Sequence, residues 1–323
     1  ALSVKHNAAD LHLCSGHLPH WRRQGVLEPI PQQTALDGDW LETFLQQWLS
    51  GVQQDELEAS GHVDFAITLE SGVRLRANLF MQRHGLSLAL RLIASQAPDI
   101  NQLQLPDVVQ QLLQLEEGLI LITGATGSGK STTLAALVDS LNREQARHII
   151  TLEDPIEFVH HSQRSLIQQR EVGTHAASFQ HGLKAALRED PDVILLGELR
   201  DSETIRLALT AAETGHLVLA TLHTRGATQA VDRLVDVFPA EEKNLVRTQL
   251  AGSLKAVLAQ RLVPAKNGGR IGLFEVLVAT PAVTNLIREG KMHQLPGVLQ
   301  TGAQAGMQTF AQSEQARQQA GLI

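Results

Sequence analysis

A glycine-rich stretch near the middle of the chain has the residue types that bind phosphate groups. It fits the pattern G-x-x-x-x-G-K-[ST] and consists of Gly124, Ala125, Thr126, Gly127, Ser128, Gly129, Lys130 and Ser131, with Thr132 next. Glycines let the backbone curl so that several N–H groups point at one phosphate. In this pattern the lysine reaches the β- and γ-phosphates and the last hydroxyl holds Mg²⁺. We therefore expect a nucleoside triphosphate and Mg²⁺ here, with Lys130 and Ser131 in these two roles.

The residues on either side of this stretch supply the context that the pattern needs. Residues 118–123 form an apolar, β-branched run that is short enough for a buried strand. After the stretch, Leu134, Leu137 and Leu141 recur at helical spacing. A strand, a glycine loop and a helix together favour a phosphate site, because the helix N-terminus adds the positive end of its dipole.

Three carboxylates lie in the five residues that follow another apolar run. The run is 148–152, and the acids are Glu153, Asp154 and Glu157. Hydrolysis of a γ-phosphate needs one carboxylate that orients or deprotonates water and another that holds the metal or positions partners. A solvated acidic loop is the alternative interpretation. The position directly after a strand, beside a phosphate loop, favours the functional one.

Another acid, Glu198, follows the apolar run 193–196 after one glycine. In nucleotide hydrolases with a phosphate loop of this kind, a carboxylate at such a strand end acts on Mg²⁺ or on the attacking water. An aspartate usually precedes it, and Gly197 takes that position here, so Glu198 is expected to serve the metal alone. A glutamate without a role is the alternative, although an unpaired charge near a core costs several kcal/mol.

Two histidines flank the apolar run 217–220. His216 precedes the run and His223 follows it, so they are expected at opposite ends of one short strand and cannot easily ligate one metal. We interpret His223 as a γ-phosphate sensor or relay, and His216 as an inter-subunit or structural residue. For each of them, an ordinary hydrogen-bonded histidine at a strand end is the alternative.

The elements that must position these residues alternate between strand and helix. This order predicts an α/β fold with a parallel sheet that is covered by helices on both faces. One helix is expected from Asp201 to Gly215. A second is expected after Pro239, with one apolar stripe formed by Val246, Leu250, Leu254 and Val257.

The chain before the glycine stretch has the pattern of a smaller mixed module. Strands are expected near residues 11–13, 64–69, 75–80 and 86–91, with a hairpin turn at Ser71-Gly72. A helix is expected from Trp40 to Leu49, with an apolar face formed by Trp40, Phe44, Leu45 and Trp48. The polar stretch 95–102 contains a proline and is the expected linker.

Composition narrows the function classes. The chain has 323 residues, is 43% hydrophobic and carries a formal net charge of −7, which argues against a nucleic-acid motor. Cys14 is its only cysteine, which excludes a disulfide within the chain and a zinc site built from several thiolates. No apolar run is long enough to span a bilayer. We expect a cytoplasmic protein that meets the membrane only through a partner and binds no nucleic acid.

Several motifs together resemble a known family. The sequences GATGSGKS, EDPIE, ALREDPDVILLGELRDSETIRLALTAAETGH and ATLHT are similar to those of the secretion and pilus ATPases, which are hexameric RecA-like motors. Among these, the chain most resembles the type IV pilus retraction ATPases, the PilT-like proteins. The resemblance extends from Ser3-Val4-Lys5 to Gly306-Met307-Gln308-Thr309.

The resemblance implies a fold and a set of roles. It implies a PAS-like N-terminal domain with its linker, residues 1–96, and a RecA-like P-loop ATPase domain, residues 97–323, in a homohexamer. ATP and Mg²⁺ are the implied cofactors. By match, Glu157 is the catalytic glutamate, Glu198 is an atypical Walker B acid that also holds the metal, and His216 and His223 are the histidine-box pair. Three N-terminal arginines match residues that can reach the nucleotide, namely Arg74, Arg76 and Arg91.

The implied function is pilus retraction through an inner-membrane platform protein, with the motor peripheral at that membrane. A type II secretion or pilus assembly ATPase is the first alternative, disfavoured because these usually carry a four-cysteine metal motif and extra N-terminal domains. A nucleic-acid translocase and a nucleotide-binding paralogue without a retraction role are the others. The last is allowed by one departure, since the family's AIRNLIRE segment is AVTNLIRE here, with Val283 and Thr284 at its second and third positions.

Overall fold

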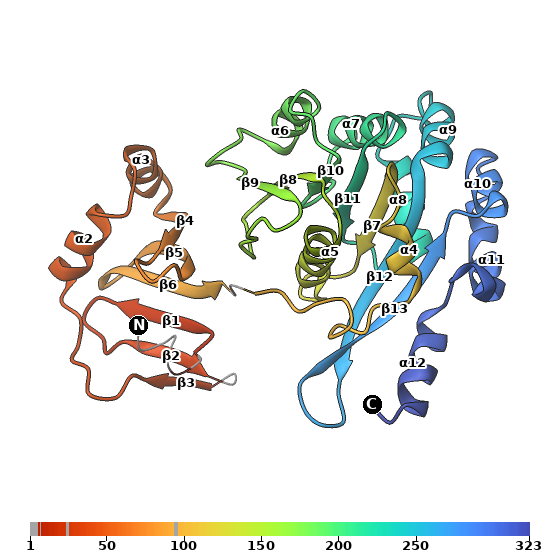
Figure 1. Ribbon diagram of the computed structural model, residues 1–323. Helices are drawn as coiled ribbons and strands as arrows, with labels where there is room; N and C mark the ends of the chain where they lie inside the picture. Colours follow the sequence, from red (N-terminus) through yellow and green to blue (C-terminus); the bar gives the residue numbers. More distant parts are fainter. Residues whose placement is uncertain (1–5, 7, 24–25, 94–95) are drawn as a thin grey trace. The chain divides into compact units, whose positions relative to one another are not determined.

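The computed structural model describes residues 6, 8–23, 26–93 and 96–323, apart from the side chains of Phe44 and Gln46. It consists of two compact units, residues 1–95 and 96–323 (Figure 1). Ser95, where the predicted linker begins, lies outside the described residues, as does the segment 3–5 that takes part in the family resemblance.

The first unit is an antiparallel sheet with two helices. Its strands are β1 (Asp10–Cys14), β2 (His20–Arg23), β3 (Val26–Pro29), β4 (His62–Thr68), β5 (Arg74–Gln82) and β6 (Gly85–Ile93), and its helices are α2 (Gly38–Gln46) and α3 (Gly51–Ser60). The six strands lie in the order β3-β2-β1-β6-β5-β4. All four predicted strands are present, as β1, β4, β5 and β6, and Gly72 with a φ of 78° makes the turn between β4 and β5.

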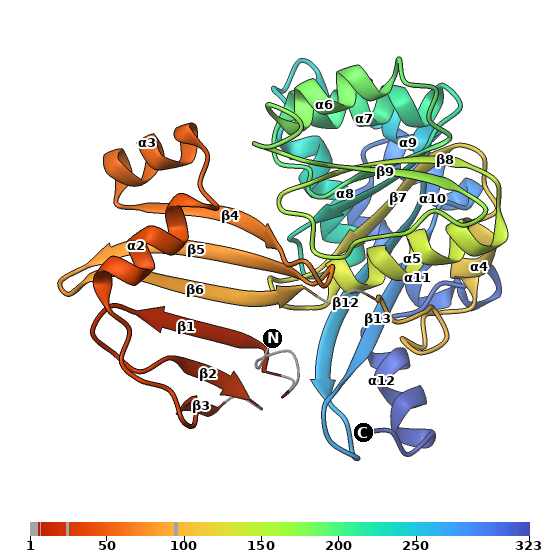
Figure 2. The ribbon, with the colours of Figure 1, turned by 60° about the vertical axis from the view of Figure 1, so that its left-hand side comes forward.

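One face of this sheet packs against α2. Alternate residues of β4, namely Val63, Phe65 and Ile67, are buried in the same cluster as Leu41 and Leu45 of the helix (Figure 2). The apolar face predicted for the helix over Trp40 to Leu49 is confirmed in part, because Leu45 is buried and Trp48 packs against the same cluster, whereas Trp40 is 47% exposed. The side chain of Phe44 lies outside the described residues. The predicted helix was also too long, since α2 ends at Gln46. Two leucines at i and i+4 are enough to anchor so short a helix.

The second unit is built on a seven-stranded sheet. Its strands are β7 (Gly118–Thr123), β8 (His148–Glu153), β9 (Leu166–Glu171), β10 (Val193–Leu196), β11 (Leu217–Leu222), β12 (Leu254–Pro264) and β13 (Arg270–Val278). They lie in the order β13-β12-β7-β11-β10-β8-β9. Neighbouring strands are parallel, except that β13 runs antiparallel to β12. The four strands predicted for this sheet are all present.

Helices cover both faces of the sheet. They are α4 (Val108–Leu112), α5 (Lys130–Glu144), α6 (Phe179–Ala186), α7 (Ser202–Glu213), α8 (Ala227–Asp236), α9 (Lys243–Ser253), α10 (Pro281–Arg288), α11 (Leu295–Thr301) and α12 (Phe310–Gln319), with 3-10 turns η1 (Met292–Gln294) and η2 (Ala303–Ala305). Figure 2 shows α6 and α7 on one side of the strands and α5 on the other.

The residues of β7 explain why both faces are covered. Leu119 and Leu121 belong to the core cluster that contains residues of α6 to α9, whereas Ile120 and Ile122 belong to the cluster under α5. Successive strand residues point to opposite faces, so a continuous apolar run needs a helical layer on each side. The expected sheet architecture is confirmed.

The helix predicted after Pro239 ends earlier than expected. Helix α9 ends at Ser253, and Leu254 and Val257 belong to β12, which pairs in parallel with the phosphate-loop strand β7. The helical spacing of Val246 and Leu250 extends to Leu254 and Val257 by coincidence, although these two residues lie in a strand that is buried on both faces. A short apolar run of that kind cannot be told from a buried helix by periodicity.

Candidate active site

The glycine stretch forms the turn from β7 into α5, as predicted. Gly129 has a φ of 91° and directly precedes α5, whose first residue is Lys130. A Cβ on Gly124 would lie 2.5 Å from the backbone oxygen of Gln260 and 2.4 Å from Ser128 Oγ, so only glycine fits there. The first N–H groups of a helix have no partner within the helix. They point toward the loop and favour an anion.

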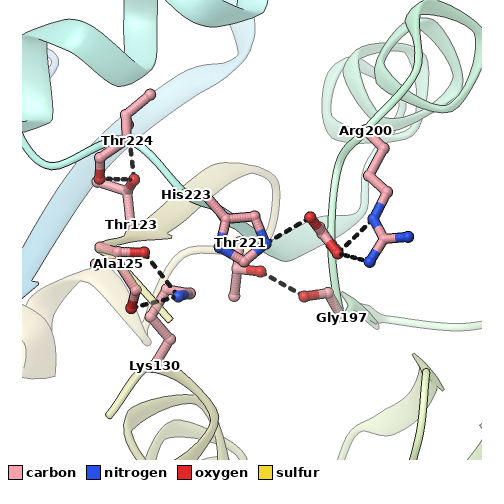
Figure 3. A network of polar contacts seen from close by, with 10 residues as sticks. Thr123, Ala125, Lys130, Gly197, Arg200, Thr221, His223 and Thr224 are labelled. Carbon is pink, nitrogen blue, oxygen red and sulfur yellow. Dashed lines mark hydrogen bonds and ion pairs between the residues drawn. The ribbon is translucent and has the colours of Figure 1, made fainter. Parts of the chain in front are cut away.

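Lys130 is buried beneath this loop. Its Nζ donates to the carbonyl oxygens of Gly124, at 2.7 Å, and Ala125, at 3.1 Å (Figure 3). Burial lowers the pKa of Lys130, and the charges of Glu198 and Glu157 oppose that shift. Both carboxylates therefore act on the same ammonium group. The lysine is held where a triphosphate in the loop would replace the two carbonyl oxygens as its partner.

A small cavity of about 80 Å³ joins the start of α5 to the carboxyl ends of β8 and β10. Ser131 lines one wall of the cavity, and the strand ends contribute Thr151, Glu153, Glu157 and Glu198. These are oxygen donors, which Mg²⁺ prefers. The sequence prediction that these acids and Ser131 meet at one edge of the sheet agrees with this geometry.

The donor set fits a metal ion that arrives with phosphate groups. In the part of the chain that the structure describes, no three His, Cys, Asp or Glu side chains gather closely enough to hold a metal ion. Mg²⁺ usually keeps several waters and is completed by one or two carboxylates and substrate phosphates. Ser131 and Glu198 are the residues here that could supply the protein's share.

Both oxygens of Glu198 are engaged. Its Oε1 lies 2.5 Å from His223 Nε2, and its Oε2 accepts from Nε and Nη2 of Arg200, each at 2.6 Å. Figure 3 shows His223 and Arg200 on opposite sides of this carboxylate. Glu198 is 15% exposed in its side chain, whereas Arg200 is 68% exposed. The carboxylate is thus fixed in position from two sides.

The acids after β8 are held differently. Glu153 Oε2 accepts from Thr151 Oγ1 at 2.7 Å and from Gln169 Nε2 at 3.2 Å. Glu157 is exposed and makes no side-chain hydrogen bond or ion pair with any residue that the structure describes. Of the carboxylates around the cavity, Glu157 and Asp154 are exposed and have no side-chain partner among the described residues.

The two predicted histidines lie at opposite ends of β11, as expected. His223 is at the carboxyl end and contacts Glu198. His216 precedes the strand, and its Nδ1 lies 3.0 Å from the backbone oxygen of Ala211 in the last turn of α7. Thr221 Oγ1 donates to the oxygen of Gly197, so this strand end also supports the β10 end. Of the pair, His223 is the one that the structure brings into the candidate site.

The predicted nucleotide-binding arginines belong to the first unit. Arg76 of β5 lies directly opposite Arg91 of β6, and Arg91 Nε donates to Asp10 Oδ1 at 2.7 Å. Arg76 and Arg91 are exposed, while Arg74 is partly buried. Arg76, Arg91 and Asp10 lie on the sheet face opposite α2. Their contact with a nucleotide stays a prediction.

Sequence reasoning missed several residues that hold the site together. Arg200 follows Glu198 by two positions, and this charge pair was the signal that could have revealed it. Gln260 of β12 is buried, and its Oε1 accepts from Thr133 Oγ1 of α5 at 2.6 Å. His160 lines the cavity with Glu157, and burial lowers its pKa. Gln260 could not be found from the sequence, because no strand was predicted where β12 lies.

Comparison with known proteins agrees with this geometry. The family model described as "Type II/IV secretion system protein" matches residues 52–321. The chain is 63% identical to the "Uncharacterized protein YggR" of Escherichia coli K12, over 98% of this chain and 96% of that one. It is 46% identical to the type IV pilus retraction ATPase PilT of Pseudomonas aeruginosa, over 96% and 90%.

A solved structure gives the same result. The crystal structure of the pilus retraction motor PilT with bound ADP superimposes with a TM-score of 0.93 at 41% identity, covering 100% of this chain and 92% of that one. The predicted α/β fold and the predicted family are both confirmed. The chain belongs to the type II/IV secretion system protein family, and within it to the PilT-like ATPases.

Proposed function

We propose that the chain is a hexameric ATP-hydrolysing motor that powers type IV pilus retraction, and with it pilus disassembly and twitching motility. The observation that carries the proposal is that Glu157 and Glu198 line one cavity at the carboxyl ends of parallel strands and that the charges of both act on Lys130. Ligands of open α/β sheets bind at such ends. The close similarity to PilT of Pseudomonas aeruginosa over nearly the whole chain supports the specific task.

The phosphate loop supplies the binding energy for the triphosphate. The backbone N–H groups of residues 124–132 surround the β-phosphate, and Lys130 exchanges its carbonyl partners for phosphate oxygens. Ser131 and Glu198 hold Mg²⁺, whose positive charge offsets the negative charge on the β- and γ-phosphates. Contacts with Arg200 and His223 hold Glu198 in position for this task.

Glu157 acts as the general base. It lies at the cavity beside Ser131 and has no competing partner among the described residues, so it can orient a water and accept its proton. His223 reports the state of the γ-phosphate, because it contacts Glu198 from the end of the neighbouring strand β11. Positioning and charge stabilisation dominate the catalysis of phosphoryl transfer, and this division of labour provides both.

The motor is proposed to be a homohexamer that works with an inner-membrane pilus platform protein. No described helix is both long and apolar enough to cross a bilayer. We infer a cytoplasmic location, peripheral at the inner membrane and reached only through the partner. Arg91 with Arg76 or Arg74 is proposed to bring positive charge to the γ-phosphate, from the same or a neighbouring subunit, when the N-terminal domain closes.

A paralogue that hydrolyses ATP without a retraction role is the second candidate function, and one altered segment supports it. The altered segment AVTNLIRE forms α10, which packs on α9 and α11. Val283 is fully buried there, so it serves packing, whereas Thr284 is partly exposed and takes the place of an arginine in the family segment.

A type II secretion or pilus assembly ATPase is less well supported, because Cys14 is the sole cysteine.

Complementation of a strain that lacks the retraction motor tests the proposal. The wild-type chain should restore twitching and pilus disassembly, and the Lys130→Ala variant at equal abundance should not. Purified protein should hydrolyse ATP at the same rate with and without DNA. Hydrolysis without restored retraction would favour the paralogue, and stimulation by DNA would favour a translocase.

A further inference from the structure

Both oxygens of the Glu198 carboxylate contact protein groups, although this is the acid proposed to serve the metal. Arg200 contacts Oε2 through two nitrogen atoms, each at 2.6 Å, and His223 contacts Oε1 at 2.5 Å. A carboxylate oxygen that accepts two charge-assisted hydrogen bonds has little capacity left for a cation. A metal ion that binds Glu198 through Oε2 must therefore displace Arg200, whereas Oε1 carries only the contact to His223.

Arg200 is the neighbour that can leave at the smaller cost. Its side chain is 68% exposed, and it lies between the end of β10 and the start of α7 at Ser202, outside both elements. Its guanidinium can be rehydrated as it moves away. His223 is 50% exposed and has a short side chain directly after β11, so its ring has less room to move.

We propose that Arg200 is a positioning residue that holds Glu198 Oε2 while the cavity contains no cation and gives it up when a divalent cation enters with the nucleotide. The arginine keeps the acid oriented, and it competes with the metal for one oxygen. The proposal rests on the metal role of Glu198 that is proposed above. It adds that the site's affinity for metal is held below its maximum by one exposed side chain.

Metal binding can be measured without turnover. The full chain is titrated with Mn²⁺, as a spectroscopic substitute for Mg²⁺, in the presence of a non-hydrolysable ATP analogue, and free Mn²⁺ is followed by electron paramagnetic resonance. Arg200→Gln should bind Mn²⁺ about two- to fivefold more tightly than wild type, the modest effect expected for an ion pair with one exposed partner. Arg200→Lys, which keeps a single ammonium group, should fall between the two.

A matched control and a second variant separate the possible failures. Arg143 is 54% exposed and pairs with Asp139 near the end of α5, so Arg143→Gln removes a comparable charge and should leave Mn²⁺ binding unchanged. Glu198→Gln should weaken binding. In Glu198→Gln, the further change Arg200→Gln should bring no tightening, because the competed oxygen is no longer part of a carboxylate.

Each outcome decides one point. Unchanged or weaker Mn²⁺ binding by a folded Arg200→Gln protein overturns the competition. Unchanged binding by Glu198→Gln instead overturns the metal role of Glu198, and with it that part of the proposed function. If Arg200→Gln proves unstable by thermal melting, Arg200→Lys carries the test alone, and its binding equal to that of wild type counts against the proposal.

Discussion

The ends of β8 and β10 both deliver carboxylates to the same cavity, yet they hold them in opposite ways. After β10, Glu198 is contacted on both oxygens by Arg200 and His223. After β8, Glu157 projects without a polar side-chain partner among the described residues. A carboxylate that is held on both oxygens is fixed in position, whereas a carboxylate without a partner can turn toward a water molecule. Differences in environment of this kind let two acids share one reaction.

The loop after β8 is anchored on the near side of Glu157, although Glu157 itself has no side-chain partner among the described residues. Ile156 is buried, and its N–H donates to Glu171 Oε1, at the end of the edge strand β9, at 3.0 Å. Glu153 at the start of the loop is tied to Thr151 and Gln169. These contacts fix the backbone on the near side of Glu157. A base on a fixed backbone can be aimed at a water without being neutralised by a partner.

Lys130→Ala should have the largest effect, because it removes the cation that both strand ends act upon. A charge-assisted contact is worth about 1.5–3 kcal/mol, or roughly 10- to 150-fold in affinity. Titration with a fluorescent ATP analogue should show this weakening, and turnover should fall to background. Lys291→Ala, which removes a lysine on the η1 side of the unit paired with Glu289, is the control. Unchanged affinity and turnover would refute the phosphate-loop assignment.

Glu157→Gln should separate the two strand ends most clearly. The amide cannot accept the proton, so hydrolysis should fall by about 10²- to 10⁴-fold, the usual contribution of a general base. Nucleotide affinity should persist, since the loop and Lys130 are untouched. Steady-state phosphate release and analogue binding on the same preparation measure both. Wild-type turnover would transfer the base role to another acid, with Glu198 the first candidate.

Arg91→Ala tests whether the first unit takes part in the chemistry of the second. If its charge reaches the γ-phosphate, hydrolysis should fall by about 10- to 100-fold, below the several-thousandfold effects known for dedicated arginine fingers. Binding should remain. Rings mixed from Arg91→Ala and Glu198→Gln subunits then identify the donor. Recovered activity means that a neighbouring subunit supplies the arginine, and a deletion of residues 1–97 that keeps full activity contradicts the role altogether.

Glu198→Gln should alter the requirement for metal more than the affinity for nucleotide. Gly197 provides no second carboxylate at this strand end, so no neighbour along the chain replaces the lost charge. We expect the Mg²⁺ concentration for half-maximal turnover to rise by about tenfold, the loss of one charge-assisted contact. A Mg²⁺ titration of ATPase activity measures this. A normal titration curve would mean that the two strand ends do not differ as their contacts suggest.

Much of this comparison could be predicted from the sequence, for local reasons. The phosphate loop, the strands β7, β8, β10 and β11 and the acids after them are set by short apolar runs with polar ends. The helix from Ser202 to Glu213 was found because Asp201 caps it, accepting from the N–H of Thr204. Each of these signals lies within a few residues of the feature that it specifies.

What the sequence did not predict depends on contacts between distant segments. Strand β9 is an edge strand with polar residues such as Gln169, and β12 has the composition of a buried helix. Both are defined by their pairing with β8 and β7. The role of Gln260, which connects β12 to α5, follows from that pairing. So does the contact between His223 and Glu198, which depends on β10 lying beside β11.

Thr284→Arg should have the smallest effect on chemistry, because no residue of α10 lines the cavity at the strand ends. The helix packs on α9 and α11, and its buried residues Val283 and Ile287 are left unchanged by the substitution. Basal ATPase activity should stay within about twofold of wild type, as expected for a surface change away from the site. Any effect should fall on twitching in the complemented strain, since the substitution restores the arginine of the family's AIRNLIRE segment. A large change in basal turnover would mean that α10 is coupled to the phosphate loop through the core. The chemistry at the ends of β8 and β10 would then depend on this distant helix as well.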